Sequence, residues 1–255
     1  MDYFQILVLA IIQGLTEFLP ISSSGHLVIF QKLFGLTQLP ILFDVLVHVG
    51  TLGAVLFYFK QELKQIFKGF IRQEKKSVQI FWLVVVGTIP AALIGFFFEK
   101  QIEAAFGSLK VVGIAFLVTA GLLFSTKWTK PVKDRLTWRD ALVIGFFQAL
   151  AILPGVSRSG STITTALWRK ATRETAFRFS FYLAVPAILG ALILKTKELF
   201  VFPVDNLIQG VIGLVIAGVV GYFALKILES TLKSARFWCF GFYCLVLGII
   251  ILLVA

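Results

Sequence analysis

Residues 13–27 of the chain read QGLTEFLPISSSGHL, and this stretch decides how the fold is interpreted. It lies in an apolar run over residues 4–34, which Pro20 and the serines after it break in the middle. A second apolar run, 139–168, is broken in the same way by LPGVSRSGST at residues 153–162. Irregular backbone at membrane depth is tolerated only where protein or a water-filled cavity satisfies its polar groups. We therefore predict that both runs are re-entrant hairpins, each of which enters and leaves the membrane on one side.

The composition assigns the rest of the chain to the membrane as well. Of 255 residues, 58% are hydrophobic and only 15% are charged, which excludes a water-solvated surface. The net charge of +11 would suggest nucleic acid in a soluble chain. In a membrane protein it marks cytoplasmic loops instead, so we expect no nucleic-acid partner.

Six further apolar runs are long enough to cross a bilayer. They cover residues 41–59, 78–98, 109–126, 177–194, 207–227 and 237–255. We predict an all-α polytopic membrane protein that forms one integral membrane domain. It has six transmembrane helices plus two re-entrant helix hairpins.

The basic residues orient this arrangement. Four segments, 60–76, 127–140, 169–178 and 226–236, hold 18 of the 24 Lys and Arg residues. If both broken runs are re-entrant, all four segments fall on one face, which is then the cytoplasmic one. The remaining loops, near residues 35–40, 99–108 and 195–206, face outward, as do both termini.

The same arrangement predicts an internal repeat. Residues 13–25 align without gaps on residues 148–160, with Gln, Leu, two Ser and Gly in common. The first hairpin enters from outside and the second from the cytoplasm, so the repeats have inverted topology. The first repeat covers 1–126 (hairpin 4–34 plus three spans) and the second covers 127–255 (hairpin 139–168 plus three spans). Such repeats place binding sites near the midplane.

Two charged residues of the hairpins, Glu17 and Arg158, are costly at membrane depth. A charge at the bilayer centre costs about 2.5 to 3.5 kcal/mol on insertion scales, so each needs a partner or a wet cavity. They could pair simply to hold the hairpins together. The residues around them favour a functional site, because Ser- and Gly-rich helix starts bind anions and Arg158 has the planar donors that phosphate oxygens accept from. We therefore expect a phosphate or diphosphate pocket within the membrane.

Beside this pocket, Ser22, Ser23, His26 and Glu17 supply the parts of an activated nucleophile or of a metal-assisted hydrolase. The residues alone do not separate a phosphatase from a carrier of phosphorylated lipid. Asp44 and His48, four residues apart, form either a helix-stabilising pair or part of the site. Gln148 repeats Gln13 in the second hairpin and is a candidate pocket residue.

Residues 13–27 and the PGVSRSGST stretch at 154–162 resemble the two signature motifs of the bacterial undecaprenyl-diphosphate phosphatase family, also called the bacitracin-resistance family. The resemblance covers essentially the whole chain. It implies hydrolysis of undecaprenyl diphosphate to undecaprenyl phosphate and inorganic phosphate, which recycles the lipid carrier for peptidoglycan synthesis and confers bacitracin resistance. It also implies a multi-pass protein of the bacterial plasma (inner) membrane, a site open to the extracytoplasmic side, a polyprenyl diphosphate substrate and a divalent cation, Mg²⁺ or Ca²⁺. The oligomeric state stays open, a homodimer included.

The resemblance also assigns roles to residues. The expected catalytic residues are Glu17, Ser23, His26 and Arg158. The expected substrate-binding residues are Gln13, Ser22, Ser24, Gly25, Ser157, Ser159 and Thr162. The first motif has Gln13 where a Glu is common, so this helix cannot supply two carboxylates to a metal. Glu17 would then hold the cation together with diphosphate oxygens and water, or it would act purely in catalysis.

For the mechanism we favour Ser23 as the nucleophile on the terminal phosphoryl group. Glu17 and His26 would handle its proton, and Arg158 would stabilise charge on the equatorial oxygens. His26 or water as the nucleophile is left open. The alternative function is a polyprenyl-phosphate transporter that uses the same phosphate pocket, because inverted repeats with broken helices are typical of alternating-access carriers.

Overall fold

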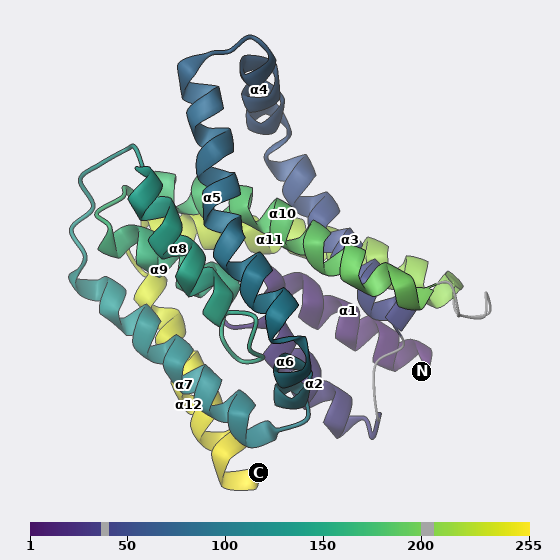
Figure 1. Cartoon of the computed structure of the whole chain (residues 1–255). Coiled ribbons are helices and arrows are strands. Elements are labelled where there is room, and N and C mark those ends of the chain that lie inside the picture. Colours follow the sequence, from purple (N-terminus) through teal and green to yellow (C-terminus); the bar gives the residue numbers. More distant parts are fainter. Residues whose placement is uncertain (37–40, 200–206) are drawn as a thin grey trace.

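The computed structural model of the chain describes residues 1–36, 41–199 and 207–255, where the secondary structure is helical (Figure 1). These ranges contain one isolated β-bridge, Lys133 with Ala171, and no strand. The predicted outward loops near 35–40 and 195–206 fall largely outside them. The all-helical part of the fold prediction is therefore confirmed.

The first broken run folds into α1 (Tyr3–Phe18) and α2 (Ser23–Leu33). Helix α1 ends just before Pro20, whose ring removes a backbone donor and clashes with the preceding turn. Helix α2 begins at once, because Ser22 is its N-cap and accepts from the amide of Gly25. Ser22 takes a left-handed φ of 66°, which turns the chain sharply between the two helices.

The second broken run folds in the same way into α8 (Trp138–Leu150) and α9 (Arg158–Trp168). Thr137 and Asp140 form a capping box at the start of α8. Gly155 has a φ of 101°, which a side chain would disfavour, and Ser157 caps α9 by accepting from the amide of Gly160. Both runs are thus broken at the predicted positions.

Five helices are long and apolar enough to cross a membrane, or six if α3 and α4 count as one bent span. The five are α5 (Lys75–Phe97), α7 (Leu109–Ser125), α10 (Arg173–Leu199), α11 (Leu207–Lys233) and α12 (Phe240–Val254). Short 3₁₀ turns, η1 (Thr126–Trp128) and η3 (Phe237–Cys239), extend α7 and precede α12. The chain is a multi-pass membrane protein on this evidence of length and hydropathy.

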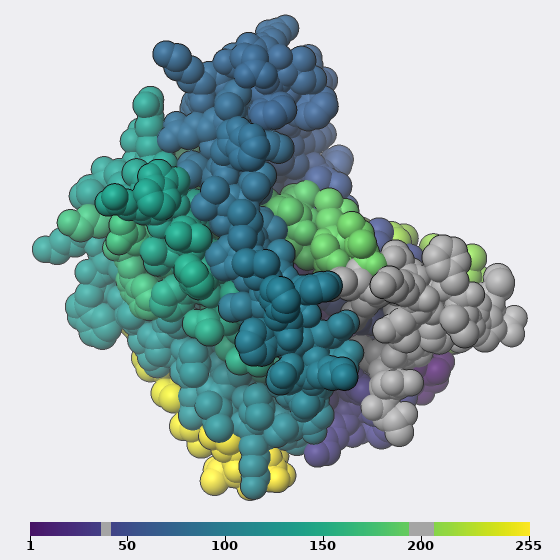
Figure 2. Space-filling view, in the orientation of Figure 1, coloured from purple at the N-terminus to yellow at the C-terminus, as the bar shows by residue number. Residues whose placement is uncertain are grey.

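The loops predicted over 60–76 and 99–108 are in large part helical, which corrects the sequence analysis. Helix α3 (Ile41–Tyr58) bends by 74° into α4 (Lys60–Ile71), and α6 (Glu99–Phe106) follows α5. Apolar residues of α4 recur at helical spacing, opposite its lysines, so the segment forms an amphipathic helix despite its charge. These apolar residues are Leu63, Ile66, Phe67, Phe70 and Ile71. Figure 2 shows α4 and the start of α5 standing out from the rest of the surface.

Glycines allow the helices around the hairpins to pack closely. A Cβ on Gly145 of α8 would lie 2.4 Å from the carbonyl oxygen of Gly87 on α5. A Cβ on Gly14 of α1 would lie 2.8 Å from the carbonyl oxygen of Ala217 on α11. Each broken run is therefore held against one long helix at backbone distance.

The two ends of the molecule differ. Helix α4 lies at the top of Figure 1 and the segment between α7 and α8 at its upper left, whereas the C-terminus lies at the bottom, the N-terminus at the right and α6 below the centre. The first group carries many of the basic residues. The breaks between α1 and α2 and between α8 and α9 lie between these two ends.

Candidate active site

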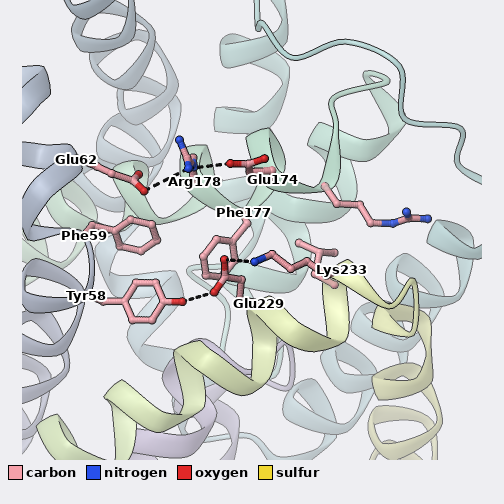
Figure 3. A pocket seen from close by; sticks show the side chains of 10 residues that line it. Tyr58, Phe59, Glu62, Glu174, Phe177, Arg178, Glu229 and Lys233 are labelled. Carbon is pink, nitrogen blue, oxygen red and sulfur yellow. Dashed lines mark hydrogen bonds and ion pairs between the residues drawn. The ribbon is translucent and has the colours of Figure 1, made fainter.

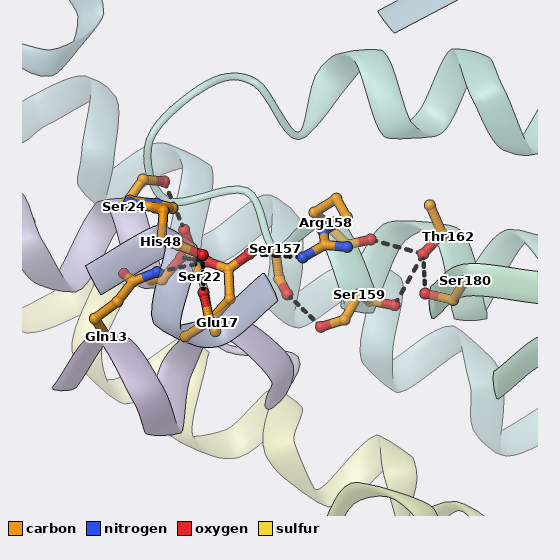
Figure 4. Close-up of polar contacts among 12 residues, drawn as sticks. Gln13, Glu17, Ser22, Ser24, His48, Ser157, Arg158, Ser159, Thr162 and Ser180 are labelled. Carbon is orange, nitrogen blue, oxygen red and sulfur yellow. Dashed lines mark hydrogen bonds and ion pairs between the residues drawn. The ribbon is translucent and has the colours of Figure 1, made fainter. Parts of the chain in front are cut away.

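The two hairpins meet through an ion pair at their breaks (Figure 4). Arg158 Nη2 donates to Glu17 Oε1 over 2.6 Å, which joins the start of α9 to the end of α1. The exposed fractions of the side chains are 14% for Arg158 and 9% for Glu17. The sequence analysis anticipated both partners, and the structure brings them into contact.

The second oxygen of Glu17 accepts from two neighbours of the first hairpin. Ser23 Oγ donates to Glu17 Oε2 over 2.6 Å, and Gln13 Nε2 donates to the same atom over 3.1 Å. The short contact directs the hydroxyl proton of Ser23 at a carboxylate, which is the geometry of a nucleophile paired with its base. Gln13 and Glu17 lie on one helix face, as their spacing predicts.

Ser22 connects the two breaks from the inside. Its hydroxyl accepts from the amide of Gly155 over 3.1 Å and from the amide of Gly25 over 3.3 Å. A Cβ on Gly25 would lie 2.8 Å from the ring of Phe116, so only glycine fits at this point. The starts of α2 and α9 are consequently fixed close together.

Thr119 of α7 supports the second break. Its hydroxyl donates to the carbonyl of Gly155 over 2.8 Å and accepts from the amide of Ser157 over 3.1 Å. Both contacts are buried. Sequence analysis did not select Thr119, because nothing in the apolar run of α7 marks one threonine as different from a lipid-facing or packing residue.

A cavity of about 630 Å³ adjoins the Glu17–Arg158 pair. Six of the predicted site residues line it: Glu17, Ser22, Ser23, Ser24, Ser157 and Arg158. Its other walls come from the second half of α10 and the ends of α3 and α5, with α6 at one side. The cavity is mostly apolar away from the pair, as expected for a site that admits a lipid.

The other predicted substrate-binding residues lie behind this wall. Gly25 packs against Phe116, and Ser159 Oγ donates to the carbonyl of Leu19 over 3.4 Å. Thr162 forms a hydrogen bond of 2.6 Å with Ser180. The residues that support the site without lining the cavity are therefore Gln13, Gly25, Ser159 and Thr162. Gln148 Nε2 donates to the carbonyl of Gly87 on α5 over 3.5 Å.

His26 is held on the far side of α2 from the cavity. Its Nδ1 donates to the carbonyl of Ser22 over 2.7 Å, so its Nε2 accepts from the hydroxyl of Tyr243, also over 2.7 Å. The ring stacks on Tyr243 and meets the edge of Phe116. In this arrangement His26 fixes the turn at Ser22, and its expected catalytic role stays a prediction.

Four titratable residues outside the expected catalytic and binding set line the same cavity, and for two of them, Asp44 and His48, the sequence left a site role open. Asp44 and His48 come from α3, and Glu99 and Glu103 come from α6. His48 Nδ1 donates to the carbonyl of Asp44 over 2.7 Å and lies 3.4 Å from its carboxylate Oδ1. The i,i+4 spacing of both pairs was visible in the sequence, but their proximity to Glu17 depends on the tertiary fold.

The atoms around Glu17 that could bind a metal ion are oxygens. Within the described residues, no group of three or more His, Cys, Asp and Glu is arranged to hold a metal. Gln13 Oε1 is buried without a hydrogen-bond partner, while Gln13 Nε2 donates to Glu17. Mg²⁺ and Ca²⁺ take such oxygen ligands, and Mg²⁺ retains several waters, so these residues fit a hard cation bound with substrate oxygens.

Comparisons with known proteins agree on one family. The family model described as bacitracin resistance protein BacA matches residues 6–250. An undecaprenyl-diphosphatase of Carboxydothermus hydrogenoformans is 42% identical over 260 residues, covering 99% of this chain and 97% of the relative. An undecaprenyl-diphosphatase of Halothermothrix orenii is 40% identical over 261 residues, covering 100% and 99%. One of Korarchaeum cryptofilum is 40% identical over 266 residues, covering 99% of each chain.

Proposed function

The chain belongs to the bacitracin resistance protein family, and we propose that its reaction centre is the junction between the α1–α2 and α8–α9 breaks. The protein is an undecaprenyl-diphosphatase, a membrane hydrolase that converts undecaprenyl diphosphate to undecaprenyl phosphate and inorganic phosphate. This reaction recycles the lipid carrier of cell-wall synthesis. It also fits bacitracin resistance, because it removes the diphosphate lipid that the antibiotic sequesters.

The observation that carries the assignment of the reaction centre is the Ser23–Glu17–Arg158 chain of contacts on the cavity wall. Both contacts to Glu17 measure 2.6 Å. A hydroxyl, a base and a planar cation are the groups that phosphoryl transfer through a serine needs. The cavity beside them measures about 630 Å³.

The first step is attack of Ser23 Oγ on the terminal phosphorus. Glu17 takes the hydroxyl proton as the Oγ–P bond forms, and the bond from that phosphorus to the bridging oxygen breaks. Undecaprenyl phosphate leaves. Water then cleaves the Ser23 phosphoester, which releases inorganic phosphate and restores the hydroxyl.

Arg158 stabilises the transferring group. Its Nη1 is buried and has no hydrogen-bond partner, while Nη2 donates to Glu17. The guanidinium therefore retains a donor for a phosphoryl oxygen without giving up its contact with Glu17. The starts of α2 and α9, which Ser22 holds together, add backbone donors and the positive ends of two helix dipoles.

We further propose that Glu17 holds a divalent cation, Mg²⁺ or Ca²⁺, together with diphosphate oxygens. The position of Glu17 on the cavity wall supports this, because a cation on its carboxylate would also reach substrate oxygens. The cation would neutralise charge on the diphosphate when bound. A chelator is expected to abolish phosphate release and Mg²⁺ or Ca²⁺ to restore it.

For the architecture we propose two inverted repeats with six spans, and a cavity that opens to the extracytoplasmic side of the plasma membrane. The matching breaks, and the packing of α1 on α11 and of α8 on α5, support the repeat. The position of α6 beside the cavity, away from the segments rich in Lys and Arg, supports the orientation.

Phosphate release by the purified protein in detergent tests the proposal. The wild type is expected to release inorganic phosphate from undecaprenyl diphosphate, and Ser23→Ala to lower the rate by about a hundredfold or more. Ser230→Ala is the control, because Ser230 of α11 is exposed and lies outside the cavity. Full release by Ser23→Ala would exclude the serine mechanism.

The same assay separates a phosphatase from a transporter. Detergent leaves no second leaflet to which a lipid could move, so a transporter would release no phosphate. No observation on the described residues favours the transporter.

A further inference from the structure

A second cavity lies at the end of the molecule opposite α6. It measures about 370 Å³ and is formed by the start of α5, the segment that joins α7 to α8, and the start of α10. None of its lining residues is shared with the cavity beside Glu17. The phosphatase mechanism uses none of them.

The lining of this cavity is strongly basic. Lys75, Lys76, Arg135 and Arg178 contribute four cations, and Asp134 contributes the one anion among its lining residues. Within the described ranges, neither Lys75 nor Lys76 nor Arg135 forms an ion pair with a carboxylate. Three cations from two separate segments therefore line one cavity without an ion pair to a carboxylate of the described chain, and Asp134 is the one acidic residue in that lining.

The segment that carries Arg135 is anchored firmly. Lys133 pairs with Ala171 in the isolated β-bridge, and its side chain donates to Asp140 over 2.6 Å. Thr175 Oγ1 donates to the carbonyl of Asp134 over 3.1 Å. Arg135 therefore belongs to a preformed wall.

Arg178 is fixed at the inner wall by a network between helices (Figure 3). It forms ion pairs with Glu174 over 2.7 Å and with Glu62 over 3.4 Å. Tyr182, which also lines the cavity, donates to the same Glu62 over 2.6 Å. This network joins the cavity to α4 and α10.

Part of the remaining wall is apolar and faces the membrane-spanning part of the fold. Leu83, Leu136 and Phe179 are buried, with exposed fractions of 7%, 4% and 5%, and Ile80 lies beside them. Helix α5 begins at Lys75 and is a candidate span from that residue on. The cations thus lie where a span meets the head-group region.

We propose that this cavity binds the phosphate head group of an anionic glycerophospholipid from the surrounding leaflet. The unpaired cations match a phosphodiester, and the apolar wall accepts the start of the acyl chains. Basic pockets between membrane helices on the cytoplasmic side bind lipid head groups of this class. Free phosphate offers the same charge but leaves the apolar wall without a partner.

Thermal unfolding of the full chain in a neutral detergent tests the proposal. Short-chain phosphatidylglycerol should raise Tm in a concentration-dependent manner, and phosphatidylcholine of equal chain length should not. The variant Lys75→Gln/Lys76→Gln/Arg135→Gln should lower the apparent affinity for phosphatidylglycerol by about a hundredfold.

The matched control is Lys64→Gln/Lys68→Gln/Arg72→Gln, which removes the same charge from exposed positions on and just after α4. It should retain the affinity of the wild type. An equal loss of affinity for phosphatidylglycerol in both variants would show that net charge alone causes the binding, and it would overturn the proposal. So would a Tm rise of the same size with inorganic phosphate.

Native mass spectrometry gives a second readout that does not depend on unfolding. The wild type and the α4 control should retain phosphatidylglycerol, and the cavity variant should lose it. Equal retention by all three proteins would contradict the site.

Discussion

Glu17 is the point where the two hairpins and the proposed chemistry meet. Its two oxygens accept from Arg158, Ser23 and Gln13, so the buried carboxylate is paired and hydrogen-bonded. An unpaired carboxylate at membrane depth would be costly. The same contacts that stabilise Glu17 also orient a hydroxyl and a guanidinium, which is why a structural and a catalytic role coincide at this residue.

Arg158→Lys is expected to retain the positive charge but to lose most activity. A lysine offers a point charge and cannot donate to Glu17 and a phosphoryl oxygen with fixed planar geometry. The expected loss in phosphate release is about 10² to 10³-fold. Turnover equal to that of the wild type would show that a point charge suffices at this position.

His26 is tested by a pair of substitutions. In the structure it holds Ser22 through a donor at Nδ1. An Asn side chain can reproduce this donor but cannot transfer a proton near neutral pH. If His26 positions the turn, His26→Asn should retain much more activity than His26→Ala, with an unchanged pH profile. Equal loss in both variants, by about 10² to 10⁴-fold, would support the proton-transfer role.

At the scale of elements, the two broken helical runs were predictable, whereas helices α4 and α6 were not predicted. Pro20 followed by serines and Gly155 followed by Ser157 are strong local signals, so both breaks could be located from sequence. Helix α4 was predicted as a loop because its lysines are typical of a cytoplasmic segment. Its apolar residues nevertheless recur at helical spacing. The apolar spans of α5, α7, α10, α11 and α12 followed from length and hydropathy.

The same contrast holds for the site. Glu17, Ser23 and Arg158 belong to local motifs and were found. Asp44 and His48 reach the cavity only because α3 packs beside the first hairpin. Thr119 supports the second break from behind, because α7 packs against it. Neither packing arrangement can be predicted from local spacing. The same is true of the hydrogen bond between His26 and Tyr243, which are far apart in the chain.

The packing of α8 on α5 gives a prediction at this scale. Gly145→Ala places a Cβ about 2.4 Å from the carbonyl of Gly87, so the helices must separate. We expect the free energy of unfolding to fall by about 1 to 3 kcal/mol, which is seen as a lower Tm in detergent. Gly53→Ala is the control, because nothing lies within 4 Å of a Cβ there. A Tm for Gly145→Ala at or above that of Gly53→Ala would contradict the close contact.

Asp140, at the loop end of α8, gives a pH-dependent prediction. Burial raises its pKa, but hydrogen bonds from Lys133, Thr137 and Arg169 outweigh this effect and hold the pKa below its usual range. The carboxylate therefore stabilises the fold above about pH 4 and loses this contribution as the pH falls further.

The comparison with Asp140→Asn measures this contribution. At pH 7 the variant should have a free energy of unfolding lower by about 1 to 3 kcal/mol, which is seen as a lower Tm. The difference between the two proteins should shrink as the pH drops below about 4. A constant difference across this range would show that the charge of Asp140 is not the stabilising feature.

At the scale of the whole molecule, one cavity lies at the breaks beside α6 and a separate cavity lies at the opposite end, where α5 begins. The one beside Glu17 carries the ion pair and the acidic residues of α6, and the other carries unpaired cations. Segments rich in Lys and Arg gather at the second end, as cytoplasmic segments do. A chain this apolar thus gathers charged residues at the junction of the two broken runs and at the end that holds the second cavity.

The central claim is that the Glu17 junction performs the hydrolysis. The most direct test is the rate of inorganic phosphate release from undecaprenyl diphosphate by purified wild type and Glu17→Gln in detergent. Glutamine retains the size of the side chain and can still accept from Arg158, but it cannot take the proton of Ser23. We predict steady release by the wild type and a rate lower by about 10² to 10⁴-fold in the variant. A correctly folded Glu17→Gln protein with the rate of the wild type would contradict the account.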